Sequence, residues 1–161
     1  MGFKWTVLVG KERQSKSFFA TAVPNKGASG RFASDKCFEF MRENGDAEGK
    51  VIVKTDQEPS IKFLVNDVIE GRPEGRTIPE ESPVKSSGSN GIVERSVGEV
   101  ECQMRSLLLG FESRIGRKID AREGIISFLP EYAVYLLNRL RQGDNGKVPY
   151  EGMEGKKPTT L

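Results

Sequence analysis

The sequence contains no histidine, and this absence excludes several kinds of site at once. Ser-His-Asp and Cys-His nucleophilic centres, His-ligated zinc and histidine pH switches all require a residue that the chain does not have. Any acid–base or metal chemistry must therefore use Asp, Glu, Lys, Tyr or Cys.

Cysteines and long apolar runs are also scarce. The two cysteines, Cys37 and Cys102, have neither a CxxC partner nor the spacing of metal ligands. This usage favours a reducing, intracellular compartment, either nucleus or cytoplasm. No apolar run approaches the roughly 18 residues of a membrane span, so we expect no membrane among the partners.

The length and the hydrophobic content of the chain are sufficient for one domain with a sizeable core. The chain has 161 residues, of which 36% are hydrophobic and 30% charged. The net charge of +2 does not by itself indicate nucleic acid. Its distribution is uneven, because an acidic middle, residues 27–104, lies between two basic ends. This pattern is typical of solvated surface, or of carboxylates that hold cations beside flanks that attract phosphates.

Residue periodicity predicts an α/β chain. A core over residues 1–142 and a flexible tail over 143–161 are expected. Between residues 71 and 91, Pro and Gly predict a loop with at most one short strand, around 76–78. The expected strands are 3–9, 18–23 and 50–56, and the expected helices are one between Gly30 and Asn44, then 59–70, 93–115 and about 125–141.

Three aromatic residues on the last predicted helix allow two interpretations. Phe128, Tyr132 and Tyr135 could stack on nucleic acid bases. Their helical spacing among leucines is more typical of core packing, which we therefore favour.

Two carboxylates stand where a site is expected. Asp56 follows a strand whose Val-Ile-Val centre suits burial on both faces, and ligand sites in α/β sheets gather at the carboxyl ends of strands. Glu94 falls in the first turn of the longest predicted helix. Two carboxylates without a histidine suit Mg²⁺ or Mn²⁺, which prefer oxygen ligands.

The residues around this pair resemble a known family. Thr55-Asp56, followed by Ser89-Asn90-Gly91 and Glu94-Arg95, is similar to the catalytic core of retroviral and retrotransposon integrases. In that family an Asp ends a core strand in a Thr-Asp motif, and a Glu follows a Ser-Asn-Gly turn on the next helix. Here 37 residues separate Asp56 from Glu94, close to the family's habitual spacing.

The resemblance implies a ribonuclease-H-like fold, with a mixed central sheet flanked by helices. It also implies polynucleotidyl transfer in DNA integration, with Asp56 and Glu94 as catalytic metal ligands. DNA is the implied partner, and a homo-oligomer is expected because integrases of this family act as multimers. The implied nucleic-acid-binding residues are Lys85, Ser86, Ser87, Ser89, Asn90 and Arg95.

One feature of the family has no counterpart in this sequence. Its first catalytic Asp lies on the first strand, whereas every acid upstream of Asp56 falls in the hairpin turn, the first helix or its exit loop. We therefore expect the first strand to be missing, Mg²⁺ or Mn²⁺ to bind weakly, and the chain to be inactive in strand transfer. The alternative is a non-catalytic DNA- or protein-binding module derived from a transposable element.

Overall fold

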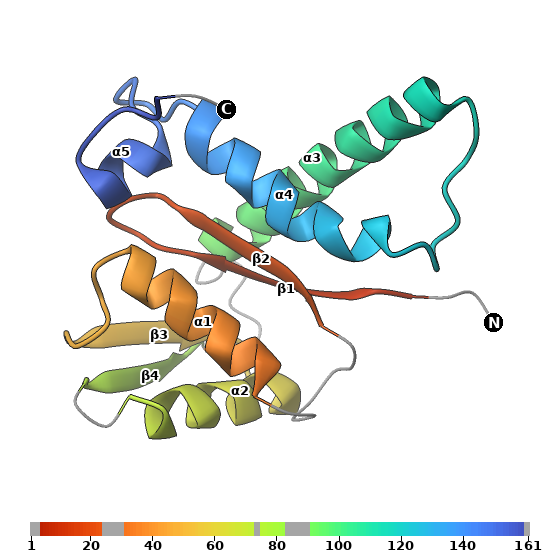
Figure 1. The fold of residues 1–161 in the computed structure, drawn as a ribbon. Helices are drawn as coiled ribbons and strands as arrows, with labels where there is room; N and C mark the ends of the chain where they lie inside the picture. The colour runs from red at the N-terminus through yellow and green to blue at the C-terminus, as the bar shows by residue number, and fades with distance from the viewer. Residues whose placement is uncertain (1–3, 24–30, 73–74, 83–90, 160–161) are drawn as a thin grey trace. The chain divides into compact units, whose positions relative to one another are not determined.

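The computed structural model describes residues 4–23, 31–72, 75–82 and 91–159. The described residues form four strands and five helices, a mixed α/β fold (Figure 1). They divide into two compact units. Unit 1 comprises residues 1–22 and 93–161, and unit 2 comprises residues 23–92. Each unit is described below by itself.

Unit 1 is built on a β-hairpin covered by helices. Strand β1 (Thr6–Lys11) pairs with β2 (Phe18–Val23), and the Glu12 amide donates to the Ser17 carbonyl across the turn. Helices α3 (Gly91–Ile115) and α4 (Ile125–Leu140) supply the opposite side of the core. The buried core residues are Phe18, Ala20, Val100 and Val134, with Val7, Val9, Met104 and Leu137 packed against them.

A buried asparagine completes the edge of β2. The Asn138 side chain of α4 accepts a hydrogen bond from the Phe18 amide (2.7 Å) and donates one to the Phe18 carbonyl (2.9 Å). The side-chain amide thus makes the two bonds that a neighbouring strand would make. This contact joins residues 120 positions apart in the sequence and fixes α4 on the hairpin.

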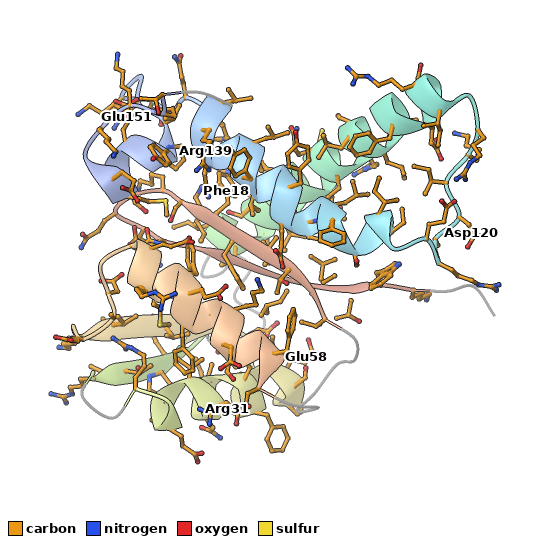
Figure 2. All side chains as sticks on the ribbon, viewed as in Figure 1. Phe18, Arg31, Glu58, Asp120, Arg139 and Glu151 are labelled. Atoms are coloured by element: carbon orange, nitrogen blue, oxygen red, sulfur yellow. The ribbon has the colours of Figure 1, made fainter. Side chains whose placement is uncertain are left out.

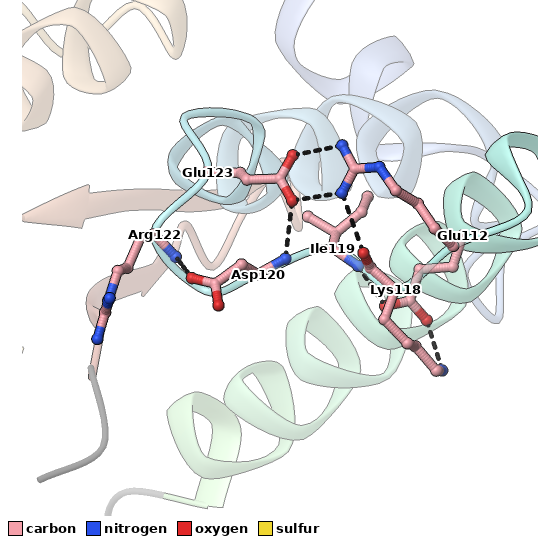
Figure 3. A network of polar contacts seen from close by, with 7 residues as sticks. Glu112, Lys118, Ile119, Asp120, Arg122 and Glu123 are labelled. Carbon is pink, nitrogen blue, oxygen red and sulfur yellow. Dashed lines mark hydrogen bonds and ion pairs between the residues drawn. The ribbon is translucent and has the colours of Figure 1, made fainter.

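The turn between α3 and α4 is held by charged side chains (Figure 3). Arg117 and Glu123 form two parallel hydrogen bonds of 2.7 and 2.9 Å, and Glu123 also accepts from the Asp120 amide. Glu112 accepts from the Ile119 amide and from the Lys118 ammonium. The pKa of Glu123 is lowered to about 2, chiefly by its hydrogen bond from Arg117. The sequence alone did not predict these ion pairs and hydrogen bonds in the turn.

Unit 2 combines a parallel strand pair with two helices. Strand β3 (Val51–Thr55) pairs in parallel with β4 (Thr77–Glu81), in a register that runs from Val51 opposite Thr77 to Thr55 opposite Glu81. Helix α2 (Pro59–Glu70) contacts both strands, and α1 (Phe32–Glu43) contacts α2. Pro at the first position of α2 and Gly71 after its last residue agree with the predicted boundaries.

A buried arginine ties the loop before β3 to the start of β4. Arg72 is 5% exposed, and its guanidinium donates to the carbonyls of Asp46, Ala47 and Gly49 and to the Thr77 hydroxyl. These carbonyls belong to the segment that leads into β3. This clamp, the Arg72 guanidinium with its hydrogen bonds, therefore holds the segment that leads into β3 beside the start of β4.

Several expectations about the fold need correction. The loop 71–91 holds a longer strand than predicted, because Pro79 is tolerated in β4, which pairs with β3 alone among the described strands. Ile52, expected to be buried, is 58% exposed. In place of one mixed central sheet, the described strands pair as two two-stranded sheets, β1 with β2 and β3 with β4.

The C-terminal segment carries structure that the sequence did not suggest. Residues 143–161 were expected to be flexible, yet Pro149–Glu154 forms helix α5, which contacts α4. Val148 and Pro149 are buried, and the Glu151 carboxylate accepts from the Val148 amide at the helix start. The division into a core over 1–142 and a tail stays a prediction.

Candidate functional site

Asp56 stands at the carboxyl end of the parallel pair in unit 2. It follows β3 directly and is exposed. Its Oδ1 accepts a hydrogen bond from the Glu58 amide (3.1 Å), which turns the chain from β3 into α2. This turn holds the carboxylate at the strand end and leaves its second oxygen free of any hydrogen bond from a described residue.

The lysines of β3 and α2, the elements on either side of Asp56, are paired with other carboxylates. Lys54 lies 3.0 Å from Glu80 on β4, and Lys62 of α2 lies 2.8 Å from Glu81. Asp56 has no ion pair among the described residues, so no described lysine or arginine neutralises its carboxylate. An exposed, unpaired carboxylate at a strand end is available to a cation.

Glu94 lies in the first turn of α3, within unit 1. Its side chain is exposed, as is that of the neighbouring Arg95. The positive end of the helix dipole stabilises a carboxylate there by about 0.3–1 kcal/mol. Asp56 and Glu94 thus belong to different units, and their meeting in one site stays a prediction. The other implied DNA contacts, Lys85, Ser86, Ser87, Ser89 and Asn90, lie outside the described residues.

The oxygen atoms of the two carboxylates are suitable ligands for a hard divalent cation. Two carboxylates are, however, few ligands for such an ion. Oxygen ligands are what Mg²⁺ and Mn²⁺ prefer. Within the part of the chain that the structure describes, no group of three or more His, Cys, Asp or Glu side chains could hold a metal ion. Weak binding of Mg²⁺ or Mn²⁺ by Asp56 and Glu94 stays a prediction.

Two other groups with reactive potential, the Cys37 thiol and the Arg72 guanidinium, are accounted for by their surroundings, whereas Cys102 is exposed. Both cysteines are free, and burial raises the pKa of the Cys37 thiol to about 12, so it is not a nucleophile near neutral pH. A hollow on unit 2 is lined by residues of α1 and of the loops that follow α1 and α2, Arg72 among them. The Arg72 guanidinium is bonded to carbonyls there, so it does not supply an anion site.

The aromatic residues of α4 are exposed, so their predicted role in the core is wrong. Phe128 is 70% exposed, Tyr132 45% and Tyr135 38%. The core side of α4 is supplied by other residues, among them Leu129, Ala133 and Val134. A signal for this was present in the sequence, since the helix carries two apolar stripes and one core needs only one of them.

None of the described helices is long and apolar enough to cross a membrane.

Neither a protein-family model nor a curated protein sequence matches the chain. Solved structures do match. The chain is similar to the catalytic core domain of BIV integrase, with a TM-score of 0.63 and 15% identity over 94% of this chain and 87% of that one. It is also similar to a chain of the simian T-cell lymphotropic virus intasome in complex with the PP2A regulatory subunit B56 gamma. There the TM-score is 0.66 and the identity 16%, over 98% of this chain and 50% of that one.

The likeness shows the fold. The chain has the fold of a retroviral integrase catalytic core over nearly its whole length, as its Thr-Asp and Ser-Asn-Gly motifs predicted. It spans about half the length of the intasome chain that it matches.

Proposed function

We propose that this chain is an integrase-type core that binds DNA and descends from a retrotransposon or a similar mobile element. The observation that carries the proposal is the likeness to the BIV integrase core over 94% of the chain, combined with the two motif carboxylates. Asp56 directly follows β3 and Glu94 stands in the first turn of α3, the two positions that the family motif requires. Both are exposed and therefore open to ligands.

In this proposal Asp56 and Glu94 hold Mg²⁺ or Mn²⁺. The bound ion would neutralise the charge that develops on a phosphodiester under attack. Arg95, exposed beside Glu94, would contact a DNA phosphate, together with Lys85, Ser86, Ser87, Ser89 and Asn90. These contacts position the backbone and carry no sequence preference of their own. Assembly into a homo-oligomer is part of the same proposal.

We propose that the chain of 161 residues binds DNA but does not catalyse strand transfer. Two carboxylates hold the ion weakly, and strand transfer needs it fixed at the phosphodiester. The test incubates the chain with a labelled oligonucleotide pair and Mg²⁺ or Mn²⁺ and resolves the products on a gel. No joined product is expected. Robust joining that disappears in Glu94→Gln contradicts the inactive assignment and supports a working enzyme.

Metal binding is tested separately from activity. Free Mn²⁺ is measured by electron paramagnetic resonance in a titration of the protein. We expect a dissociation constant in the millimolar range, with weaker binding in Asp56→Asn and Glu94→Gln. Glu70→Gln, an exposed carboxylate at the end of α2, is the matched control and leaves the titration unchanged. Equal curves for all four proteins contradict the assignment of Asp56 and Glu94 as ligands.

The alternative is a binding module without any metal chemistry. It is favoured by the absence of a three-carboxylate cluster from the described residues and by the basic ends of the chain. It predicts salt-dependent DNA retention that is unchanged in the double variant Asp56→Asn, Glu94→Gln. Failure to bind both DNA and divalent metal contradicts this alternative and the main proposal together.

A further inference from the structure

Lys11 has surroundings that no other described lysine shares. It is the last residue of β1 and is half-buried. The other half-buried lysines among the described residues, Lys36, Lys54 and Lys62, are each paired with a carboxylate. The remaining described lysines are exposed. The Lys11 amine has neither an ion pair nor a hydrogen bond to a described residue. It is therefore withdrawn from water without a carboxylate to compensate its charge.

The Lys11 amine lies on the face of a buried aromatic ring. Its Nζ is 3.0 Å from the ring centroid of Phe18, which is 1% exposed and belongs to the core of unit 1 (Figure 2). An aromatic face attracts a cation, but it does not accept the three hydrogen bonds that water offers to an exposed ammonium. The ring thus replaces only part of the hydration that the charged form of Lys11 loses.

The charged groups around Lys11 are engaged with one another or carry the same charge. Arg141, which follows α4, has its Cζ 5.7 Å from the Phe18 centroid and donates to the Glu99 carboxylate of α3 at 2.9 Å. In the hairpin turn, Glu12 accepts hydrogen bonds from amides of its own turn, and Lys16 is a further cation that acts on Lys11. Both neighbouring carboxylates are therefore held by other donors.

These surroundings favour the neutral amine. Burial, together with the charges of Arg141 and Lys16, lowers the pKa of Lys11 to about 8, and Glu99 and Glu12 oppose this shift only in part. At pH 7.5 an amine with that pKa is neutral in about a quarter of the molecules, whereas an ordinary lysine is neutral in about one in a thousand. A desolvated lysine beside another cation is the arrangement that activates an amine as a nucleophile.

We propose that Lys11 is an acylation site, at which the amine reacts directly with acyl thioesters. The Nζ lone pair attacks the thioester carbonyl carbon, the C–N bond forms as the C–S bond breaks, and the thiol leaves with the proton that the amine gives up. The products are an acylated lysine and a free thiol, and no oxidant or reductant is consumed. The reaction removes one positive charge from the hairpin of unit 1. The site does not use Asp56 or Glu94, so it goes beyond the proposed function and is independent of it.

The surroundings of Lys11 favour an acyl donor over an aldehyde as the reagent. An amide nitrogen is neutral at every pH near 7, so acylation leaves no charge on the ring of Phe18. An imine formed from an aldehyde keeps a basic nitrogen, and its protonated form meets the same loss of hydration as the ammonium.

The test incubates the full chain with acetyl-coenzyme A at pH 7.5 and measures acetylation at each lysine by mass spectrometry after cleavage at glutamate. Lys11 is expected to react about 10-fold faster than the exposed Lys50 and Lys147, because the gain in neutral amine exceeds the loss of nucleophilicity that accompanies a lower pKa. The rate at Lys11 is expected to level off above about pH 8, whereas the rates at Lys50 and Lys147 continue to rise toward about pH 10.

Two variants of the neighbouring charges are expected to change the rate in opposite directions. In Arg141→Gln the Glu99 carboxylate loses its partner and becomes available to Lys11, so acetylation of Lys11 is expected to slow toward the rate of an exposed lysine. In Glu99→Gln the carboxylate that favours the ammonium is lost, so acetylation is expected to accelerate by up to about 4-fold, the limit set by complete deprotonation. Arg114→Gln, an exposed arginine in the last turn of α3, is the matched control and is expected to leave the rate unchanged.

Concentrated urea separates the effect of the fold from that of the local sequence. In the unfolded chain Lys11 is expected to react at the rate of Lys50 and Lys147, because its pKa returns to the ordinary value. Circular dichroism identifies any variant that does not fold, and the comparison of lysines within the wild type requires no variant at all.

Any of four results overturns the proposal. The first is a rate at Lys11 within about 2-fold of the rates at Lys50 and Lys147 in the folded wild type. The second is the absence of acetylation at Lys11. The third is a preference for Lys11 that persists in urea, and the fourth is a folded Arg141→Gln variant that reacts as fast as the wild type. Asp56→Asn and Glu94→Gln are expected to keep the preference for Lys11, so failure of the proposed metal site leaves this test intact.

Discussion

Replacing Asn138 is expected to loosen α4 from the hairpin of unit 1. Asn138 is 8% exposed, and its amide satisfies both the N–H and the C=O of Phe18 at 2.7 and 2.9 Å. In Asn138→Leu the shape is nearly kept, and both backbone groups lose their partner in a site closed to water. A buried polar group without a partner costs about 1–3 kcal/mol, so we expect a loss of about 2–6 kcal/mol.

Two further variants separate hydrogen bonding from packing. Asn138→Ala opens space for a water molecule that can replace part of the lost bonding, and we expect a loss of about 2–3 kcal/mol. Asn138→Asp can accept from the Phe18 amide but cannot donate to its carbonyl when ionised, so it is expected to fall between the wild type and Asn138→Leu near neutral pH. Asn145→Ala, an exposed asparagine in the same unit, is the control and is expected to cost less than about 1 kcal/mol.

The assay is urea unfolding followed by circular dichroism, with the free energy obtained from midpoint and slope. Amide hydrogen exchange gives a local readout, because the Phe18 amide is expected to lose protection in Asn138→Leu and to keep it in Asn145→Ala. A stability of Asn138→Leu within about 0.5 kcal/mol of the wild type would refute the reasoning. So would an unchanged exchange rate at Phe18, since both results would mean that the amide pair is satisfied in another way.

The remaining predictions concern charged groups. Arg72→Met is expected to cost about 2–4 kcal/mol in urea unfolding because it removes charge-assisted bonds to three carbonyls, whereas the exposed Arg76→Met is expected to cost under about 0.5 kcal/mol; equal losses contradict the clamp. The pKa of Glu123 is lowered to about 2, so the stability that it contributes is complete above its ordinary value of 4.5 and is lost as pH falls toward 2. The gap in melting temperature between wild type and Glu123→Gln is therefore expected to close over that range, and a gap independent of pH contradicts the assignment. Burial lowers the pKa of Lys11 to about 8, below its ordinary 10.5, so the unfolded chain holds more protons between these values and stability rises with pH there. Lys11→Met is expected to abolish this rise in melts between pH 8 and 10, and a rise that persists in the variant assigns it to another group.

Local patterns in the sequence predicted most of the elements. The periodicity of α1, α2, α3 and α4 and the β-branched runs of β2 and β3 correspond to elements near the expected positions. These signals are local, because they depend on which side chains share a face. β4 and α5 were harder to predict. β4 contains Pro79 and pairs with β3, and α5 is a helix of six residues that begins at the buried Pro149, directly after the buried Val148.

The candidate site was predictable only as far as its motifs extend. Asp56 and Glu94 were identified by their spacing and by the Thr-Asp and Ser-Asn-Gly residues beside them, and both stand at the element ends expected for them. For Phe128, Tyr132 and Tyr135 the favoured prediction, packing in the core, was wrong, because all three are exposed. An apolar stripe on a helix indicates only that its residues lie on one side of the helix. Helix α4 has apolar residues on two sides, so the stripe does not identify the buried side. Which side faces the core is decided by what packs against it.

The sequence by itself determined the excluded chemistries, the main helices and strands, the likeness to integrase cores and the two carboxylates on which the proposed function rests. Each of these depends on residue type and on spacing along the chain. The tertiary structure alone decided that Asn138 completes β2, that Arg72 clamps the start of β3, and that the rings of Phe128, Tyr132 and Tyr135 are exposed. The physical reason is the same for all three. Each depends on groups that are distant in the sequence and adjacent in the folded chain. Only folding decides whether a polar group has a hydrogen-bond partner and whether an aromatic ring is covered by other side chains.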